Sequence, residues 1–211
     1  MYKQNFFFIV FEGVEGTGKS YQINKLYKKL KKKKLRIIKT REPGGVDTAE
    51  KIRKLIFNKS SNKFDKITDF YLMLASRNEH FIKKLLPAKK KNLIVISDRF
   101  TDSTFCYQVV GNKISSDVNR INQEYILNNF KPNLTFVLRS DLKSVKKRLN
   151  SRKVLNKYDN LKFSFYKKVQ NSFVQIAKKN KKNYILIDTS FNNEVAEKKI
   201  FTIIKKKLRL K

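Results

Sequence analysis

The sequence predicts a three-layer α/β fold, in which a five-stranded parallel sheet lies between layers of helices. Short apolar runs alternate with helical patterns along the whole chain of 211 residues, which is typical of parallel strands joined by crossover helices. The pattern Gly-x-x-x-x-Gly-Lys-Ser occupies residues 13–20, between a strand-like run and a helix-like run. No linker rich in Pro, Gly or Ser interrupts the sequence, so we expect residues 1–211 to form a single domain.

The strand candidates are short runs of β-branched and aromatic residues without strict alternation, as expected for strands that are buried on both faces. They are Phe6–Phe11, Leu35–Thr40, Asn92–Ser97, Leu134–Leu138 and Tyr184–Ile187. The patterns between and after them predict helices at about 19–33, 47–58, 66–86, 116–129, 141–151, 161–180 and 193–208. We expect the N-terminal caps of three of these helices to be Asp47, Ser116 and Asp141.

Residues 13–20 predict a P-loop, which binds the phosphates of a nucleoside triphosphate. Glycine at positions 13, 16 and 18 permits positive φ and a close approach of the backbone to the phosphates. Lys19 should reach the terminal phosphates, and the Ser20 hydroxyl should bind Mg²⁺. The residues expected to hold the phosphates are Gly13, Val14, Glu15, Gly16, Thr17, Gly18, Lys19 and Ser20.

Polar motifs also follow other strand candidates. Residues 40–45 read Thr-Arg-Glu-Pro-Gly-Gly, and residues 98–108 read Asp-Arg-Phe-Thr-Asp-Ser-Thr-Phe-Cys-Tyr-Gln. Ligands of parallel α/β sheets bind beyond the carboxyl ends of the strands, so these motifs should meet the P-loop at one site. Arg99, and Arg77 in an otherwise apolar helical stretch, carry planar guanidinium groups that suit a phosphate group.

Together, these motifs and the basic segment at residues 148–159 resemble the bacterial thymidylate kinases over nearly the whole chain. The resemblance implies a P-loop kinase domain of the nucleoside monophosphate kinase type, with a short lid at about residues 150–160. It also implies a homodimeric enzyme that phosphorylates dTMP to dTDP in dTTP synthesis, with ATP as the donor and Mg²⁺ as the cofactor.

The resemblance further implies roles for individual residues. The catalytic residues would be Lys19, Asp98, Arg99 and Arg152, and Ser20 and Asp98 would hold Mg²⁺, partly through water. Arg152 would supply the lid arginine, since the P-loop itself contains none, and Arg148 would lie on the adenine side of ATP. The residues implied for dTMP binding are Glu15, Glu42, Pro43, Arg53, Met73, Arg77, Arg99, Ser103, Thr104, Tyr107 and Gln108.

The sequence departs from the family pattern at three places. The stretch after Tyr107 and Gln108, which is usually rich in glycine and arginine, reads Val-Val-Gly-Asn-Lys at residues 109–113. Met73 stands where the family usually stacks a phenylalanine on thymine, and residues 156–159 read Asn-Lys-Tyr-Asp in place of Asp-Arg-Ile-Glu. We expect His80, the single histidine, to have a structural role, because phosphoryl transfer needs no imidazole base. One alternative interpretation is another nucleoside or nucleotide kinase of the same fold.

The composition raises a second alternative, a nucleic-acid-binding P-loop module. The 50 basic residues exceed the 17 acidic ones, which gives a net charge of +33. The excess is nearly all lysine, spread along the chain, and we interpret it as coding bias, so nucleic acid binding is not required. No apolar run approaches the ~20 residues of a membrane span, and Cys106 is the only cysteine. We therefore expect a cytoplasmic protein without a membrane partner.

Overall fold

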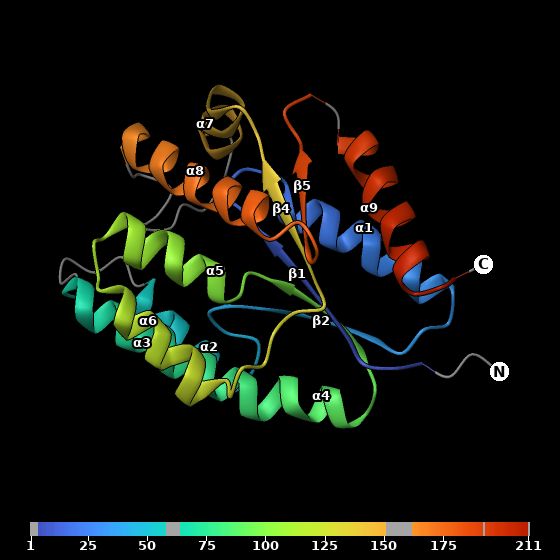
Figure 1. The fold of residues 1–211 in the computed structure, drawn as a ribbon, viewed down its shortest axis with the longest axis horizontal. Helices are drawn as coiled ribbons and strands as arrows, with labels where there is room; N and C mark the ends of the chain where they lie inside the picture. The colour runs from blue at the N-terminus through green and yellow to red at the C-terminus, as the bar shows by residue number, and fades with distance from the viewer. Residues whose placement is uncertain (1–3, 58–63, 151–161, 192, 211) are drawn as a thin grey trace.

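The computed structural model describes residues 4–57, 64–150, 162–191 and 193–210. At its centre lies a five-stranded parallel sheet in the order β2-β3-β1-β4-β5, with helices on both faces (Figure 1). The strands are β1 (Phe7–Glu12), β2 (Ile37–Arg41), β3 (Ile94–Asp98), β4 (Leu134–Arg139) and β5 (Tyr184–Asp188). The predicted fold class is confirmed.

The central strand β1 explains why the strand patterns do not alternate. Residues 8–11 are all at most 1% exposed, because helices cover both faces of the sheet. Every strand ends one residue later than its apolar pattern predicts, at a charged residue. Arg41 of β2 and Asp98 of β3, for example, still pair in register. The polar groups that follow the apolar runs are therefore fixed by the sheet itself.

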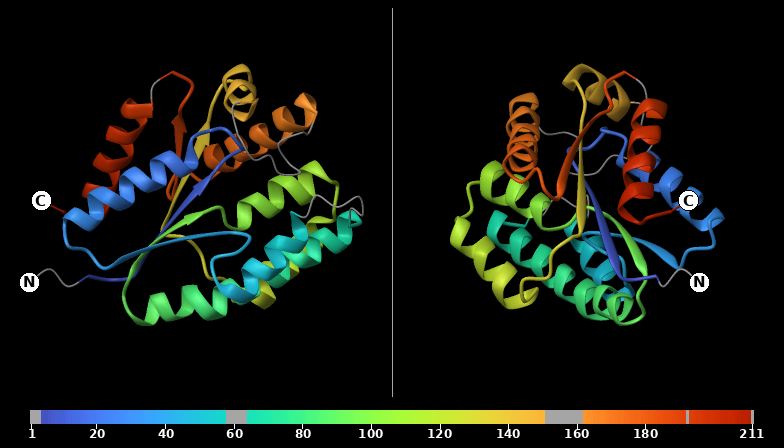
Figure 2. Two further views of the ribbon diagram at one scale, coloured as in Figure 1. Left: turned by 180° about the vertical axis from the view of Figure 1, so that it is seen from behind. Right: turned by 45° about the vertical axis from the view of Figure 1, so that its right-hand side comes forward.

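Helices α1 (Lys19–Lys32) and α9 (Asn193–Lys207) lie on one side of the sheet, as the right-hand view in Figure 2 shows. Their apolar residues, among them Ile23, Leu26 and Ile200, form one buried cluster with the facing side chains of the strands. Since α1 begins at Lys19, this packing holds the start of the helix against the carboxyl end of β1.

The other helical segments build the second helical layer. They are α2 (Asp47–Ile56), α3 (Lys66–His80), η1 (Phe81–Leu85), α4 (Leu86–Lys90), α5 (Thr101–Thr104), η2 (Phe105–Gly111), α6 (Ser116–Ile121), η3 (Asn122–Ile126), α7 (Leu142–Asn150) and α8 (Phe163–Lys179). The segments η1, η2 and η3 are π-helical and continue α3, α5 and α6 without a break. Several helices of this layer therefore include a π-helical segment.

The helix formed by α5 and η2 is not predicted by the sequence pattern. Its residues are mostly β-branched, aromatic or polar, and these do not mark out an amphipathic stripe. Burial decides its structure, since Thr104, Cys106, Tyr107 and Gln108 are all at most 4% exposed. Tertiary packing therefore overrides weak local propensity here.

Of the predicted N-terminal helix caps, Asp141 is confirmed and Asp47 is not. Asp141 caps α7, because its Oδ1 accepts a hydrogen bond of 2.8 Å from the backbone N–H of Ser144. The prediction for Asp47 is wrong: this residue is the first of α2, and Val46 occupies the extended cap position without a side-chain bond. Asp47 still lies in the first turn, where a negative charge is favoured by the helix dipole.

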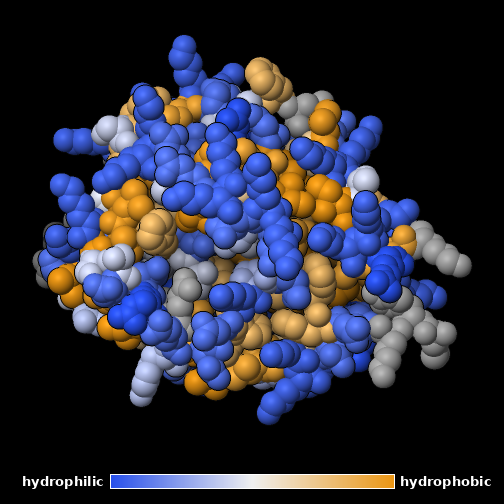
Figure 3. All heavy atoms as spheres, viewed as in Figure 1, coloured by the Kyte–Doolittle hydropathy of each residue, from blue (hydrophilic) through white to orange (hydrophobic). Residues whose placement is uncertain are grey.

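Hydrophilic side chains cover most of the face shown in Figure 3, with apolar side chains between them. This agrees with lysines that are spread along the sequence. Across the described residues, no helix combines the length and the apolar character needed to cross a membrane.

Candidate active site

The P-loop connects the end of β1 to the start of α1. Gly13 has a φ of 130°, and a Cβ atom there would lie 2.2 Å from the carbonyl oxygen of Leu138, so only glycine fits. The Nζ of Lys19 donates to the carbonyl oxygens of Gly13 and Val14, at 2.8 Å each. The loop is thus closed around an ammonium group, as expected for a site that receives phosphates.

Burial and, after it, the nearby Arg99 guanidinium lower the pKa of the Lys19 ammonium group to about 8, against the opposing effect of Asp98 and Glu15. The positive charge on Lys19 is therefore poised to be stabilised by an anion. A phosphate group bound in the loop would supply that anion.

A cavity of about 320 Å³ opens beside the P-loop. It is bounded by the P-loop, by the turns after β2 and β3, and by side chains of α2, α3, α5 and η2. Its lining residues are Glu15, Gly16, Gly18, Lys19, Ser20, Tyr21, Arg41, Glu42, Pro43, Arg53, Phe57, Met73, Arg77, Asp98, Arg99, Phe100, Ser103, Thr104, Tyr107 and Gln108. The structure therefore brings together every residue that the sequence assigns to dTMP binding.

Four lining residues were not predicted from the sequence: Tyr21, Arg41, Phe57 and Phe100. Arg41 and Phe100 lie within the two motifs, so position alone could have indicated them. Phe57 lies one helical turn after Arg53, and the Arg53 guanidinium carbon is 4.5 Å from the centre of its ring.

Arg77 reaches the cavity wall from α3. Its Nε donates to Glu42 Oε2 at 2.7 Å, and its Nη2 donates to the carbonyl oxygen of Phe100 at 3.0 Å. The third nitrogen, Nη1, is buried and has no hydrogen-bond partner among the residues that the structure describes. Burial raises the pKa of the Glu42 carboxyl, but Arg77 and His80 outweigh this effect and hold it below its ordinary value. Glu42 is thus an ionised carboxylate that orients the Arg77 guanidinium group, whose Nη1 has no partner among the described residues.

Arg99 approaches the same cavity from the end of β3, where it adopts a φ of 74°. Its Nη2 donates to Glu15 Oε1 at 2.6 Å, and its Nη1 donates to Ser103 Oγ at 3.0 Å. The hydroxyl of Tyr107 donates to Glu15 Oε2 at 2.5 Å. Burial raises the pKa of Glu15, yet Arg99, Lys19 and Tyr107 together keep it below its usual range. The P-loop carboxylate is therefore charged, and each of its oxygens accepts a hydrogen bond.

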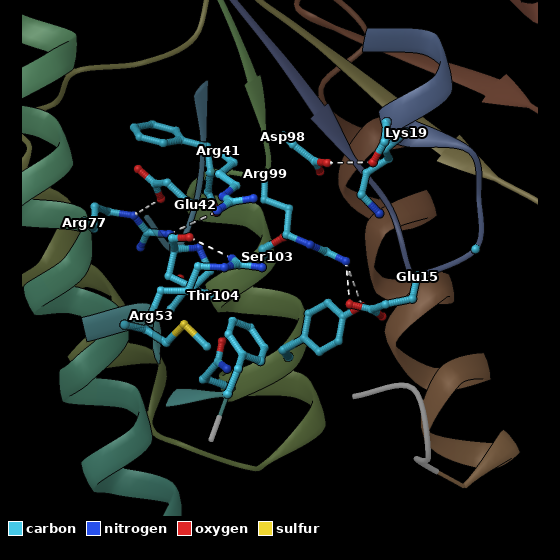
Figure 4. Close-up of a pocket in the computed structure, with 18 of the residues that line it drawn as sticks. Glu15, Lys19, Arg41, Glu42, Arg53, Arg77, Asp98, Arg99, Ser103 and Thr104 are labelled. Carbon is cyan, nitrogen blue, oxygen red and sulfur yellow. Dashed lines mark hydrogen bonds and ion pairs between the residues drawn. The ribbon is translucent and has the colours of Figure 1, made fainter. Parts of the chain in front are cut away.

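Figure 4 shows how these groups are arranged: Glu15 and Lys19 come from the P-loop side, and Arg53 and Arg77 face them from the helices opposite. Arg53 donates from Nη1 to the carbonyl oxygen of Pro43 at 2.7 Å, which ties α2 to the turn after β2. Cationic groups thus line two opposite walls of one cavity.

Asp98 and Ser20 lie at the P-loop end of the cavity. The Ser20 hydroxyl donates to Asp98 Oδ2 over a long 3.4 Å, and Asp98 Oδ1 is buried without a partner in the described part of the chain. A hydroxyl and an unsatisfied carboxylate oxygen are ligands that suit Mg²⁺, which usually takes only one or two protein ligands beside phosphates and water. No larger cluster of His, Cys, Asp and Glu capable of holding a metal occurs among the described residues.

Arg148 extends from α7 to the backbone of the P-loop. Its Nη1 donates to the carbonyl oxygen of Gly16 at 3.1 Å, and its Nη2 donates to that of Thr189 at 2.9 Å. It therefore joins the loop after β5 to the P-loop. Arg152 lies outside the described residues, as does the predicted lid from residue 151 onwards.

A parallel α/β sheet, a P-loop at the end of its first strand and an arginine-lined cavity facing that loop define a class of protein, the P-loop kinases of the nucleoside monophosphate kinase type. The family model for thymidylate kinase matches residues 11–200. The thymidylate kinase of Mycoplasma capricolum subsp. capricolum is 35% identical over 204 residues, which cover 96% of each chain.

A second relative, the thymidylate kinase of the Aster yellows witches'-broom phytoplasma, is 38% identical over 205 residues, again 96% of each chain. The crystal structure of thymidylate kinase from Ehrlichia chaffeensis superposes with a TM-score of 0.77 at 27% identity, and the match covers 95% of this chain and 99% of that one. The chain belongs to the thymidylate kinase family.

Proposed function

We propose that the protein transfers the γ-phosphoryl group of ATP to dTMP, giving ADP and dTDP, as a step in dTTP synthesis. The observation that carries the proposal is one cavity that joins the P-loop to the side chains expected to bind dTMP. Membership of the thymidylate kinase family supports the same reaction.

Transfer between two nucleotides requires positioning and the neutralisation of negative charge. Lys19 and the P-loop N–H groups would hold the β- and γ-phosphates of ATP. Arg77 across the cavity and Arg99 beside the P-loop would hold the phosphate of dTMP. An oxygen of that phosphate forms the new bond to the γ-phosphorus as the bond from this phosphorus to the β-phosphate oxygen breaks. Arg77 suits this task because its buried Nη1 finds no partner in the part of the chain that is described.

Ser20 and Asp98 are the residues that would hold Mg²⁺, Asp98 partly through water. When bound, the ion would spread the negative charge of the donor phosphates. The unsatisfied Oδ1 of Asp98 supports this assignment. Arg148 would lie near the adenine, and Arg152 would bring a lid arginine to the transferring phosphate, in line with an arginine-free P-loop.

Thymine and deoxyribose would be recognised by other residues that line the cavity. Glu15 would accept a hydrogen bond from the 3′-hydroxyl, and Tyr107, which donates to Glu15, would lie beside the sugar. Arg53, Thr104 and Gln108 would address the base. The rest of the dTMP pocket would be formed by four more residues that line the cavity: Glu42, Pro43, Met73 and Ser103.

We also propose that the enzyme is a homodimer, as the resemblance implies, and that exposed apolar side chains of α2, α3 and the helix formed by α6 and η3 take part in the contact. These include Leu55, Tyr71, Ile121 and Tyr125, which are between 52% and 88% exposed. Residues 1–211 would form a single kinase domain, with a lid at about 150–160. We place the reaction in the cytoplasm, where both nucleotide substrates are available.

A coupled ADP-release assay with Mg·ATP and a panel of dTMP, dUMP, dCMP, dGMP and UMP tests the proposal. We expect the highest kcat/KM with dTMP, no requirement for DNA, and loss of turnover when EDTA removes the divalent cation. Equal rates across the panel would favour a broader nucleotide kinase of the same fold. DNA-dependent ADP release without dTDP would favour a nucleic-acid-binding module.

A further inference from the structure

A chain of buried hydrogen bonds leads from the sheet to the cavity through the single histidine. Thr40 Oγ1 lies 2.6 Å from His80 Nε2, and His80 Nδ1 lies 2.9 Å from Glu42 Oε1. The second oxygen of Glu42 accepts from Arg77 Nε at 2.7 Å. His80 is 0% exposed and does not itself line the cavity. Through Glu42 and Arg77, both of which line the cavity, His80 is connected to it indirectly.

The chemistry of Glu42 assigns the proton on the His80 ring. Arg77 and His80 hold the pKa of the buried Glu42 carboxyl below its ordinary value, so Glu42 is ionised and can only accept hydrogen bonds. His80 Nδ1 must then carry a hydrogen and donate it to Glu42. In the neutral ring, Nε2 accepts a hydrogen bond from the hydroxyl of Thr40.

The turn after β2 is shaped around this pair. A Cβ atom on Gly45, whose φ is 92°, would lie 2.4 Å from Thr40 Oγ1 and 2.7 Å from His80 Cδ2. The neighbouring Gly44 N–H donates to Ser76 Oγ at 3.0 Å. One side of α3 thus holds the turn at three points, through Ser76, Arg77 and His80.

We infer that His80 is a positioning residue for the phosphate group of the acceptor nucleotide. By holding one oxygen of Glu42, it directs the other oxygen at Arg77 Nε, and this fixes the guanidinium group that carries the unpartnered Nη1 at the cavity wall. This inference rests on the proposed function. It adds that a buried imidazole, which never touches substrate, sets how strongly the enzyme binds the phosphate of dTMP compared with its nucleoside part.

Two amide substitutions separate this role from simple packing. In His80→Asn, the side-chain amide nitrogen can occupy the place of Nδ1 and still donate to Glu42. In His80→Gln, the amide reaches toward the place of Nε2 and Thr40, and Glu42 loses its donor. The two variants differ by one methylene group, so they form a matched pair. Thr40→Val is a further control, since it breaks the other bond of the same histidine.

The decisive measurement is the ratio of the dissociation constants of thymidine and dTMP, because only dTMP carries the group that Arg77 would bind. In His80→Gln this ratio should fall at least ~10-fold, since one charge-assisted hydrogen bond is misdirected. His80→Asn and Thr40→Val should keep the ratio within ~3-fold of the parent value, with the KM for ATP unchanged in all three variants.

A double-mutant cycle ties the effect to Arg77. In an Arg77→Ala background, His80→Gln should lower the ratio no further, because the group that it positions is gone. Additive losses would show that His80 acts elsewhere. Equal weakening of thymidine and dTMP, or an unchanged ratio in His80→Gln, would also overturn the inference.

A measurement on the unmodified protein keeps the inference falsifiable if a variant does not fold. The ¹⁵N resonances of the only histidine, in untagged protein, should report a ring with hydrogen on Nδ1. A neutral ring protonated only on Nε2 would refute the assigned contact. Failure of the proposed function would look different, since the parent enzyme itself would then form no dTDP.

Discussion

Replacing Glu12 with glutamine should weaken the dependence of the protein's stability on pH. Glu12 ends β1 and is 0% exposed. Its Oε1 accepts from the backbone N–H groups of Phe100 and Ser103, at 2.7 and 3.2 Å, and its Oε2 lies 2.6 Å from Ser103 Oγ. Burial and, after it, the neighbouring Asp102 carboxylate raise the pKa of the carboxyl to about 8, against the opposing effect of Arg99.

The direction of the pH dependence that Glu12 contributes follows from proton binding. Between the unfolded pKa of 4.5 and the folded pKa of about 8, the folded state binds a proton that the unfolded state lacks. The contribution of Glu12 to the free energy of unfolding is therefore fully present below pH 4.5 and is lost as the pH rises to about 8. The shift corresponds to an upper bound of ~5 kcal/mol. Burial also raises the pKa of the Asp102 carboxyl, so the two neighbouring carboxyl groups titrate together. We therefore expect glutamine to remove only ~2 kcal/mol of the decline in the free energy of unfolding.

Glutamine resembles the protonated carboxyl, since its Oε1 still accepts two N–H groups and its Nε2 can donate to Ser103 Oγ. Urea denaturation of parent and Glu12→Gln protein at pH 5, 6, 7 and 8 measures the difference. The effect of the large net charge is common to both proteins and cancels. Asp102→Asn is the control, and it should lower the slope only partly. Parallel pH profiles for parent and Glu12→Gln would refute the reasoning.

Three further predictions concern the reaction. Lys19→Ala should lower kcat at least ~10²-fold while the fold survives, and a near-normal kcat in the folded variant would contradict this. In the parent, kcat/KM for ATP should fall above pH 8, where Lys19 loses its charge, whereas Lys19→Arg should show no such fall. Arg152→Ala should lower kcat by ~10³-fold with little change in dTMP binding, and finding that pattern in Arg148→Ala instead would show that the lid register is wrong. Met73→Phe should lower the KM for dTMP by up to ~10-fold through ring stacking on thymine, and a raised KM would count against this placement of the base.

The sheet was predictable from the sequence because its signal is local. Buried strands are short apolar runs, and each run ends where a polar motif begins. The helix at residues 101–111 was not predictable, since nothing in its own pattern overcomes its β-branched and aromatic residues. Four of its residues were nevertheless assigned to the site, because the motif at 98–108 carries their identity independently of the secondary structure.

Contacts between distant parts of the chain limit what can be predicted for the site. Glu42 meets His80 and Arg77 across 38 and 35 residues of sequence, and no periodicity reports such a pairing. His80 was expected to be structural, and nothing in its sequence surroundings points to Glu42. Its place in the hydrogen-bond chain emerges only once α3 packs against the turn after β2.

The carboxylates of the site explain how several cations can share one cavity before substrate arrives. A carboxylate in a P-loop should repel phosphates, but Glu15 is held by Arg99 at 2.6 Å. Glu42 serves Arg77 in the same way. Each arginine is thus pre-oriented and partly neutralised, so binding dTMP does not require cations to be assembled against their mutual repulsion. These pairs fix the direction of the donors, whereas the surplus charge on the surface adds no such direction. Substrate affinity set by the buried pairs should therefore be less sensitive to salt than long-range attraction of nucleotides to the lysine-rich surface.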